Sequence, residues 1–183
     1  WLLNHYYCLD RQSKGLRPLT LSRFAGFGSH RYPLGFSGDT AIKWSVLDFQ
    51  PYFTATAANA GYCWWSHDIG GHNFGKLSDE LYHRWVQFGV FSPIMRFHSV
   101  NDARKSKEPW KFGGEAERIT KKFLRLRHRM IPYTYTMNRL VEKEGRPLIM
   151  PMYYAYPNRD EAYSVGNQYF FGTQLIAAPI THK

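Results

Sequence analysis

Three polar clusters decide the fold: Ser-Gly-Asp at 37–39, Ser-His-Asp-Ile-Gly-Gly at 66–71 and Met-Arg-Phe-His at 95–98. Each cluster ends a short apolar or aromatic run, as expected where strand ends deliver side chains to one shared pocket. Parallel barrels place functional groups at the carboxyl ends of successive strands. With an arginine at 23, the polar positions 23, 39, 68 and 98 lie 16, 29 and 30 residues apart. The sequence therefore predicts an active site on barrel strands.

Length and composition indicate a globular piece of a longer protein. The 183 residues are 44% apolar and 17% aromatic, enough for a sizeable core and unlike a disordered chain. A complete (β/α)8 barrel takes about 250 residues, so we expect further chain outside these residues. No long apolar span and no charged-then-apolar leader occurs, so neither a membrane segment nor a signal peptide is predicted. Cys8 and Cys63 stand outside any Cys-x-x-Cys pattern, which favours free, buried thiols.

The net charge of +10 raises the question of a polyanionic partner. Residues 101–146 hold 13 of the 24 Lys and Arg against 6 acids, so most of the excess is local. This region carries a helical stripe of apolar side chains, with a parallel basic row at Arg118, Lys122, Arg125 and Arg129. The simplest interpretation is a solvated helix face, and nucleic-acid binding is not favoured.

Strands and helices alternate along the first part of the chain. The pattern predicts strands at 19–23, 34–36, 62–65 and 94–97, and helices at 48–60 and 79–91. Gly61 and Ser78 have the chemistry of a C-cap and an N-cap for these two helices. A long helix is expected after Gly113-Gly114, with a kink at Pro132.

The character of the chain changes after Gly145. Strand-like runs at 148–156 and 169–180 are separated by Pro-Asn-Arg-Asp at 157–160. We therefore divide the α/β chain at residue 146: residues 1–146 are expected to form a partial barrel, and residues 147–183 the beginning of a β-rich unit.

Two aspartates are candidates for chemistry, and each has a structural alternative. Asp39 follows Gly38, which lets the backbone approach a ligand, and lies between Phe36 and Trp44, where partial burial would raise a carboxyl pKa as a proton donor requires. The same Ser-Gly-Asp-Thr is also turn and cap chemistry. Asp68 precedes Ile-Gly-Gly, where the carboxylate either faces a pocket or stabilises the turn.

A metal site is not favoured by the sequence. His67, Asp68 and His72 form a His-Asp-x3-His pattern that matches no established ligand spacing, so satisfied polar residues explain it more simply. Arg96 and His98 alternate with apolar neighbours, so both side chains could point into a barrel mouth. Charged groups there need partners.

Longer stretches around these positions follow a known pattern. They are Arg23, Gly-Ser-His-Arg-Tyr-Pro-Leu-Gly-Phe-Ser-Gly-Asp at 28–39, Ser-His-Asp-Ile-Gly-Gly at 66–71, the run from Glu80 to Pro93, and Arg-Phe-His at 96–98. Together they resemble glycoside hydrolase family 31, the family of α-glucosidases and α-xylosidases. Glu-Pro-Trp at 108–110, Arg-x-x-x-Ile-Pro-Tyr at 127–133 and Phe-Gly-Thr-Gln-Leu-Ile-Ala-Ala-Pro-Ile at 171–180 resemble later family segments, in order and at matching spacing.

The resemblance implies a fold and a reaction. Residues 1–146 would form the second half of a (β/α)8 TIM barrel, about strands five to eight, and residues 147–183 the start of an all-β sandwich. The implied activity is hydrolysis of terminal α-linked glucose- or xylose-type residues by a retaining double displacement between two carboxyls about 5 Å apart. The implied partner is an oligosaccharide or glycoside, with no metal, organic cofactor, nucleic acid or membrane involved.

The resemblance also assigns roles to five residues. Asp39 matches the catalytic general acid/base of the family. Arg23, Asp68 and His98 match residues that bind the hydroxyls of the sugar being cleaved. Phe36 stands where many members carry a Trp that lines the subsite of this sugar.

Two departures from the family pattern matter. His72 replaces the Phe that commonly follows Asp-Ile-Gly-Gly. The family nucleophile is an Asp in a Trp-x-Asp motif after the fourth strand, and this motif is absent here; Asp10 and Asp48 do not lie in that context. We therefore expect the nucleophile upstream of residue 1 and no activity from these residues alone.

Alternatives on the same scaffold are a transglycosylase, a lyase, or a non-catalytic carbohydrate-binding relative. The sequence carries no signal for the sugar, linkage, compartment or oligomeric state.

Overall fold

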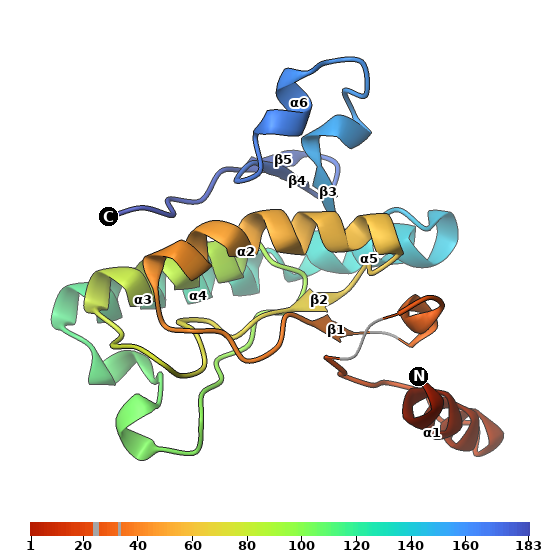
Figure 1. Ribbon diagram of the computed structural model, residues 1–183, viewed down its shortest axis with the longest axis horizontal. Helices are drawn as coiled ribbons and strands as arrows, with labels where there is room; N and C mark the ends of the chain where they lie inside the picture. Colours follow the sequence, from red (N-terminus) through yellow and green to blue (C-terminus); the bar gives the residue numbers. More distant parts are fainter. Residues whose placement is uncertain (24–25, 33) are drawn as a thin grey trace.

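The computed structural model describes residues 1–23, 26–32 and 34–183. Its α-helices are α1 (Leu2–Ser13), α2 (Trp44–Thr56), α3 (Asp79–Val90), α4 (Gly114–Arg129), α5 (Ile131–Glu144) and α6 (Glu161–Ser164). Its strands are β1 (Gly35–Phe36), β2 (Trp65–Ser66), β3 (Ile149–Pro151), β4 (Tyr169–Phe171) and β5 (Leu175–Ala177). Helices α2 to α5 lie between the β1–β2 pair on one side and the β3–β4–β5 sheet on the other (Figure 1).

Four segments of the first part pair in parallel, each with the next along the chain. β1 pairs with β2, and single bridges join Ser22 to Gly35 and Ser66 to Ile94. Helix α2 connects β1 to β2, and α3 connects β2 to the segment at Ile94. Parallel neighbours joined through helices are the repeating unit of a barrel wall. The wall therefore brings the carboxyl ends of all four segments to one edge.

The predicted strands at 19–23 and 94–97 were wrong in extent. Ser22 and Ile94 each make one bridge, and no strand is assigned to either segment in the described part of the chain. The Ser22 amide bonds to the Leu34 carbonyl and the Ile94 amide to the Trp65 carbonyl, so each outer segment is tied to its neighbour over a short length only.

Local capping chemistry set the ends of α2 and α3. A 3-10 turn continues α2 to Gly61, whose φ of 81° is the left-handed cap conformation predicted for it. The Ser78 hydroxyl accepts a hydrogen bond from the Leu81 amide at 3.3 Å, which confirms the predicted N-cap of α3. Helix α2 begins at Trp44 rather than at the predicted Asp48.

The predicted long helix is two helices, α4 and α5, that meet at Met130. Pro132 lies in the first turn of α5, where its missing N–H is not needed, whereas within one continuous helix its ring would clash with the preceding turn. The basic row of α4 at Arg118, Lys122, Arg125 and Arg129 is exposed, as predicted for a solvated face.

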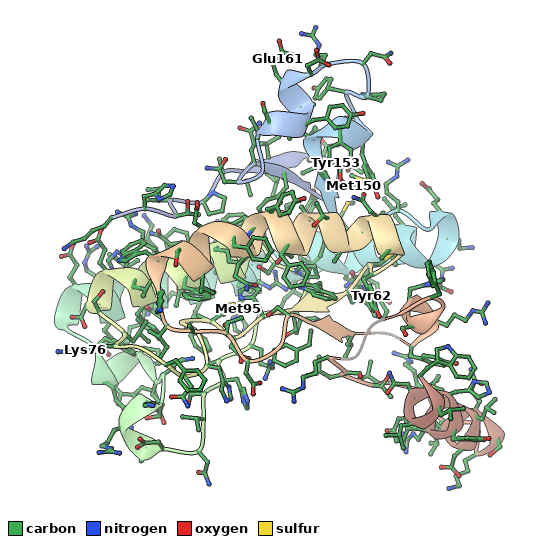
Figure 2. All side chains as sticks on the ribbon, viewed as in Figure 1. Tyr62, Lys76, Met95, Met150, Tyr153 and Glu161 are labelled. Atoms are coloured by element: carbon green, nitrogen blue, oxygen red, sulfur yellow. The ribbon has the colours of Figure 1, made fainter. Side chains whose placement is uncertain are left out.

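Residues beyond Gly145 form a small antiparallel sheet in the order β3–β4–β5. The predicted strand at 148–156 is shorter, because a 3-10 turn follows β3. The predicted strand at 169–180 folds back as the β4–β5 hairpin, with Gly172 at a φ of 67° in the turn. In Figure 2 the labelled Met150 and Tyr153 lie in this unit, on the far side of the helices from Tyr62 and Met95.

One hydrophobic core joins the wall, the helices and the sheet. Its fully buried members include Leu47 of α2, Trp85 of α3 and Tyr169 of β4, and Ile69 just after β2 belongs to the same cluster. The core fixes the wall against the helices, so the polar segments at the strand ends are held from behind.

Helix α1 was not predicted and lies beside the main body (Figure 1). His5 of α1 lies 2.8 Å from the Tyr32 hydroxyl, and Trp1 stacks on His5. Cys8 and Cys63 are both free thiols; Cys8 is buried, as predicted, whereas Cys63 is only half-buried. Within the described ranges, no helix has the length and apolar character to span a bilayer.

Candidate active site

The predicted site residues gather at one edge of the wall. Arg23 directly follows the Ser22 bridge, Asp39 follows β1, and Asp68 follows β2. His98 comes four residues after the Ile94 bridge. All four therefore stand at carboxyl ends of parallel segments, the edge where barrel enzymes assemble their chemistry.

Asp39 lies between a guanidinium and an imidazole. Its Oδ2 is 3.3 Å from Nη1 of Arg23 and 3.8 Å from Nε2 of His72. The Nδ1 of the same imidazole lies 3.2 Å from Oδ2 of Asp68. His72 thus stands between the two carboxylates.

The expected burial of Asp39 was wrong. Its side chain is 46% exposed. It lies in a turn at Gly38, whose φ is 82°, between the backbone bond from the Ser37 amide to the wall and the bond from the His72 amide to the Thr40 carbonyl. The carboxyl at this turn is open to solvent.

Asp68 is fully buried and paired with Arg96. The Arg96 Nη2 donates to Oδ1 of Asp68 at 2.5 Å, and its Nε donates to the Ser66 hydroxyl at 3.2 Å. The guanidinium also lies over the Phe36 ring, 4.7 Å from its centroid. Arg96, which the sequence marked as needing a partner, therefore neutralises the buried carboxylate and orients it.

Burial raises the pKa of Asp68, and the positive charges of Arg96, His98, Lys107 and His72 oppose this rise. The Asp68 side chain is 0% exposed, so desolvation is the larger effect. The basic neighbours allow a carboxylate to exist at this depth.

Lys107 ties the segments of the site together. Its ammonium donates to the carbonyl oxygens of Gly71 and His98, which joins the loop after Asp68 to the last segment of the wall. Burial lowers the pKa of Lys107 to about 8, against the raising effect of Asp68.

A cleft of about 820 Å³ opens beside His72, His98 and Lys107. The rings of His72 and His98 lie 5.2 Å apart, and His98 is exposed. Asp39 is not one of the described residues that line this cleft.

His67 does not belong to the site. It is fully buried, stacks on Phe88, receives the Trp85 indole N–H at Nδ1 and contacts the Ser92 hydroxyl through Nε2. Burial, with smaller contributions from the charges of Arg96 and Lys107, lowers its pKa to about 3. The prediction of a satisfied polar residue is confirmed for His67.

The structure adds a residue that sequence reasoning missed. Lys107 lies in a charged stretch with nothing to distinguish it from its neighbours, and its role arises from contacts with segments far away in the chain. The sequence marked His72 as a departure from a family pattern, but it did not predict the position of this side chain between two carboxylates.

The arrangement suits the recognition and protonation of a polyhydroxylated ligand. An exposed carboxyl stands beside buried, charge-balanced groups that can exchange hydrogen bonds with hydroxyls. Phe36 adds an apolar surface, although Arg96 lies over its ring.

Curated relatives match the chain almost end to end. It is 32% identical over 177 residues to Alpha-glucosidase 2 of Bacillus thermoamyloliquefaciens, and the aligned region is 96% of this chain and 22% of that protein. It is 30% identical over 167 residues to an Alpha-xylosidase of Saccharolobus solfataricus, which covers 89% of this chain and 22% of that protein. The chain thus spans about a fifth of the length of these relatives.

A solved structure shares the fold. The Flavobacterium johnsoniae GH31 dextranase FjDex31A, complexed with glucose, superposes with a TM-score of 0.84 at 33% identity, over 91% of this chain and 22% of that one. Residues 3–137 match the glycosyl hydrolases family 31 TIM-barrel domain, and residues 145–183 match the glycosyl hydrolase family 31 C-terminal domain. With three quarters of its length in the barrel match and the polar strand ends in place, the chain belongs to glycoside hydrolase family 31.

Proposed function

We propose that this chain supplies part of the active site of a retaining α-glycoside hydrolase that removes terminal glucose- or xylose-type residues. The observation that carries the proposal is that Asp39 lies between Arg23 and His72, and that His72 also faces Asp68, at the carboxyl ends of parallel segments. In the whole protein, residues 1–146 would contribute about strands five to eight of the barrel, and residues 147–183 the beginning of a β-sandwich.

Asp39 is proposed as the general acid/base. An acid that protonates a leaving oxygen must reach a substrate and then a water molecule, and the exposed carboxyl beyond the wall edge has that access. In the first step Asp39 donates its proton to the departing glycosidic oxygen. In the second step it accepts a proton from water, which attacks the anomeric carbon of the glycosyl intermediate.

The nucleophile is proposed to come from another part of the protein. The 183 residues hold no Trp-x-Asp motif. A second carboxyl about 5 Å from Asp39 would attack the anomeric carbon and form the covalent intermediate. Residues 1–183 by themselves are therefore expected to leave glycosides intact.

Arg23, Asp68 and His98 are proposed to hold the hydroxyls of the cleaved sugar. Asp68 is held through Oδ1 by Arg96, whereas its buried Oδ2, 3.2 Å from Nδ1 of His72, makes no hydrogen bond to any described residue and is the oxygen proposed to accept from a hydroxyl. Preoriented groups of this kind gain strength as positive charge develops on the sugar ring in the transition state. Phe36 would give the ring an apolar contact.

The Asp39 assignment is tested in the full-length protein with Asp39→Asn. For substrates whose leaving group needs protonation, kcat/KM should fall about 100- to 10,000-fold. For activated aryl α-glycosides it should fall far less, because an aryl leaving group departs with little protonation. Kinetics on an alkyl or disaccharide substrate and on an aryl glycoside give the two values. Asp10→Asn in α1 is the matched control and should behave as wild type. An equal loss on both substrate classes would remove Asp39 from this role.

A further inference from the structure

A cluster of metal-ligating atoms overlaps the proposed sugar site. One ligand atom from each of Asp68, His72 and His98 lies within 4.8 Å of the other two. The loop between Asp68 and His72 turns through Gly70 and Gly71, whose φ angles are 82° and 77°. The turn brings the two side chains together although their spacing matches no common motif.

Asp68 and His72, the two less exposed members of this cluster, make no hydrogen bond to each other. Asp68 Oδ2 and His72 Nδ1 lie 3.2 Å apart, yet both atoms are buried without a hydrogen bond to any described residue. Ligand bonds to Zn²⁺ of about 2.0–2.1 Å place tetrahedral donor atoms about 3.3 Å apart. The separation of these two atoms therefore fits adjacent ligands of one ion.

The surroundings orient both donors. The Arg96 guanidinium donates to Oδ1 of Asp68, and the other oxygen, Oδ2, faces His72. On the other side of the imidazole, Nε2 of His72 faces the Asp39 carboxylate at 3.8 Å. At this distance the two groups make no hydrogen bond, but the negative charge of the carboxylate favours a proton on Nε2 and leaves the lone pair on Nδ1, the nitrogen nearer Asp68.

We propose that Asp68, His72 and His98 form a binding site for a divalent transition-metal ion such as Zn²⁺ or Cu²⁺. Two imidazoles and one carboxylate favour these ions over Mg²⁺ and Ca²⁺, which take oxygen ligands. His98, which is exposed, supplies the third ligand atom at the rim of the site. The cations Arg96 and Lys107 stand close by, so the ion binds more weakly than in a structural zinc site.

A bound ion would block the sugar. Asp68 and His98 are two of the groups proposed to hold its hydroxyls, and they cannot serve both ligands at once. The ion is therefore an inhibitor that competes with substrate. This consequence rests on the proposed function, whereas metal binding does not.

Binding is tested first, without reference to activity. The full-length protein is titrated with Zn²⁺ in competition with a chromogenic indicator. We expect Zn²⁺ affinity to fall at least about tenfold in His72→Phe and in His98→Gln. His98 is exposed, so the second variant keeps the fold even where the first disturbs it. His128→Gln, on the exposed face of α4, is the matched control and should bind as wild type. Wild-type affinity in both site variants, or no binding to wild type, overturns the proposal.

Competition is tested second, on an aryl α-glycoside. Zn²⁺ should raise KM without lowering kcat, a chelator should reverse this, and His72→Phe should need at least tenfold more Zn²⁺ for the same inhibition. If the variants lose Zn²⁺ binding but Zn²⁺ inhibits the wild type noncompetitively, the metal site is supported and its overlap with the sugar site is rejected. A full-length protein that binds Zn²⁺ through His72 and hydrolyses no α-glycoside rejects the proposed function alone.

Discussion

His67 and Asp68 are adjacent in the chain and face opposite sides of the wall. His67 points into the helices against Phe88, and Asp68 points to the polar edge against Arg96. Alternation of side chains along extended backbone explains the division. Both side chains are buried, but His67 has a structural role, whereas Asp68 is a candidate for binding a ligand at the polar edge.

The acid sensitivity of the fold should depend on His67. Its folded pKa of about 3 lies below the unfolded value of about 6.5, so the folded state binds fewer protons between these values. The contribution of neutral His67 to the free energy of unfolding is fully present above about pH 6.5 and is lost as the pH falls toward 3. At pH 5 the loss is about 2 kcal/mol relative to pH 7.5.

His67→Gln, which can still accept from Trp85 and donate to Ser92, should lose about 2 kcal/mol less than wild type between these two pH values. Urea unfolding of the full-length protein at both pH values measures the difference. The exposed His128→Gln should retain the acid loss of wild type. The same acid loss in His67→Gln would show that other groups cause it.

At the scale of elements, the loop after β2 depends on Gly71. Its φ is 77°, and an added Cβ would lie 2.8 Å from the Ala41 carbonyl oxygen, a backbone atom that a side-chain rotation cannot move aside. This close approach lets the loop lie against the segment after β1. Asp39 and His72 meet as a result.

Gly71→Ala should therefore destabilise the protein by about 1–3 kcal/mol and raise KM for glycosides, because the loop must shift and carry Asp68 with it. Denaturation midpoints and steady-state kinetics of the full-length protein give both quantities. Gly114→Ala is the control, since its added Cβ meets nothing within 4 Å. Unchanged KM in Gly71→Ala would separate the loop from the site.

At the scale of the whole molecule, the β3–β4–β5 sheet is joined to the helices by two tyrosine hydroxyls, one from buried Tyr169 and one from half-buried Tyr133. The Tyr169 hydroxyl donates to the Phe91 carbonyl at the end of α3 at 3.0 Å, and burial raises the pKa of Tyr169. The Tyr133 hydroxyl of α5 donates to the Phe171 carbonyl at 2.7 Å. With a shared core as well, we expect the two parts to unfold together.

Tyr169→Phe should cost about 1 kcal/mol in the free energy of unfolding, the usual net value of one buried hydrogen bond. Chemical denaturation followed by fluorescence measures it, and one transition should remain. Tyr135→Phe, whose side chain is exposed on α5, should change stability by less than about 0.5 kcal/mol. Separate transitions in wild type would contradict the shared core.

Local chemistry made several features predictable from sequence. The caps at Gly61 and Ser78 and the break near Pro132 depend on backbone groups within a few residues. The positions of Asp39 and Asp68 at strand ends followed from apolar runs that stop at polar residues. The shared edge then follows, because parallel neighbours end on the same side.

Sequence by itself determined which residues stand at the polar edge, since their order depends on short-range patterns of strand, turn and helix. The tertiary structure alone decided how those residues pair: Arg96 with Asp68, His72 between two carboxylates, Lys107 across two backbone segments, and Asp39 open to solvent. Pairing depends on distances of a few ångströms between side chains and backbone groups that are between 4 residues apart, for Asp68 and His72, and 36 residues apart, for Gly71 and Lys107, and no local pattern contains that information.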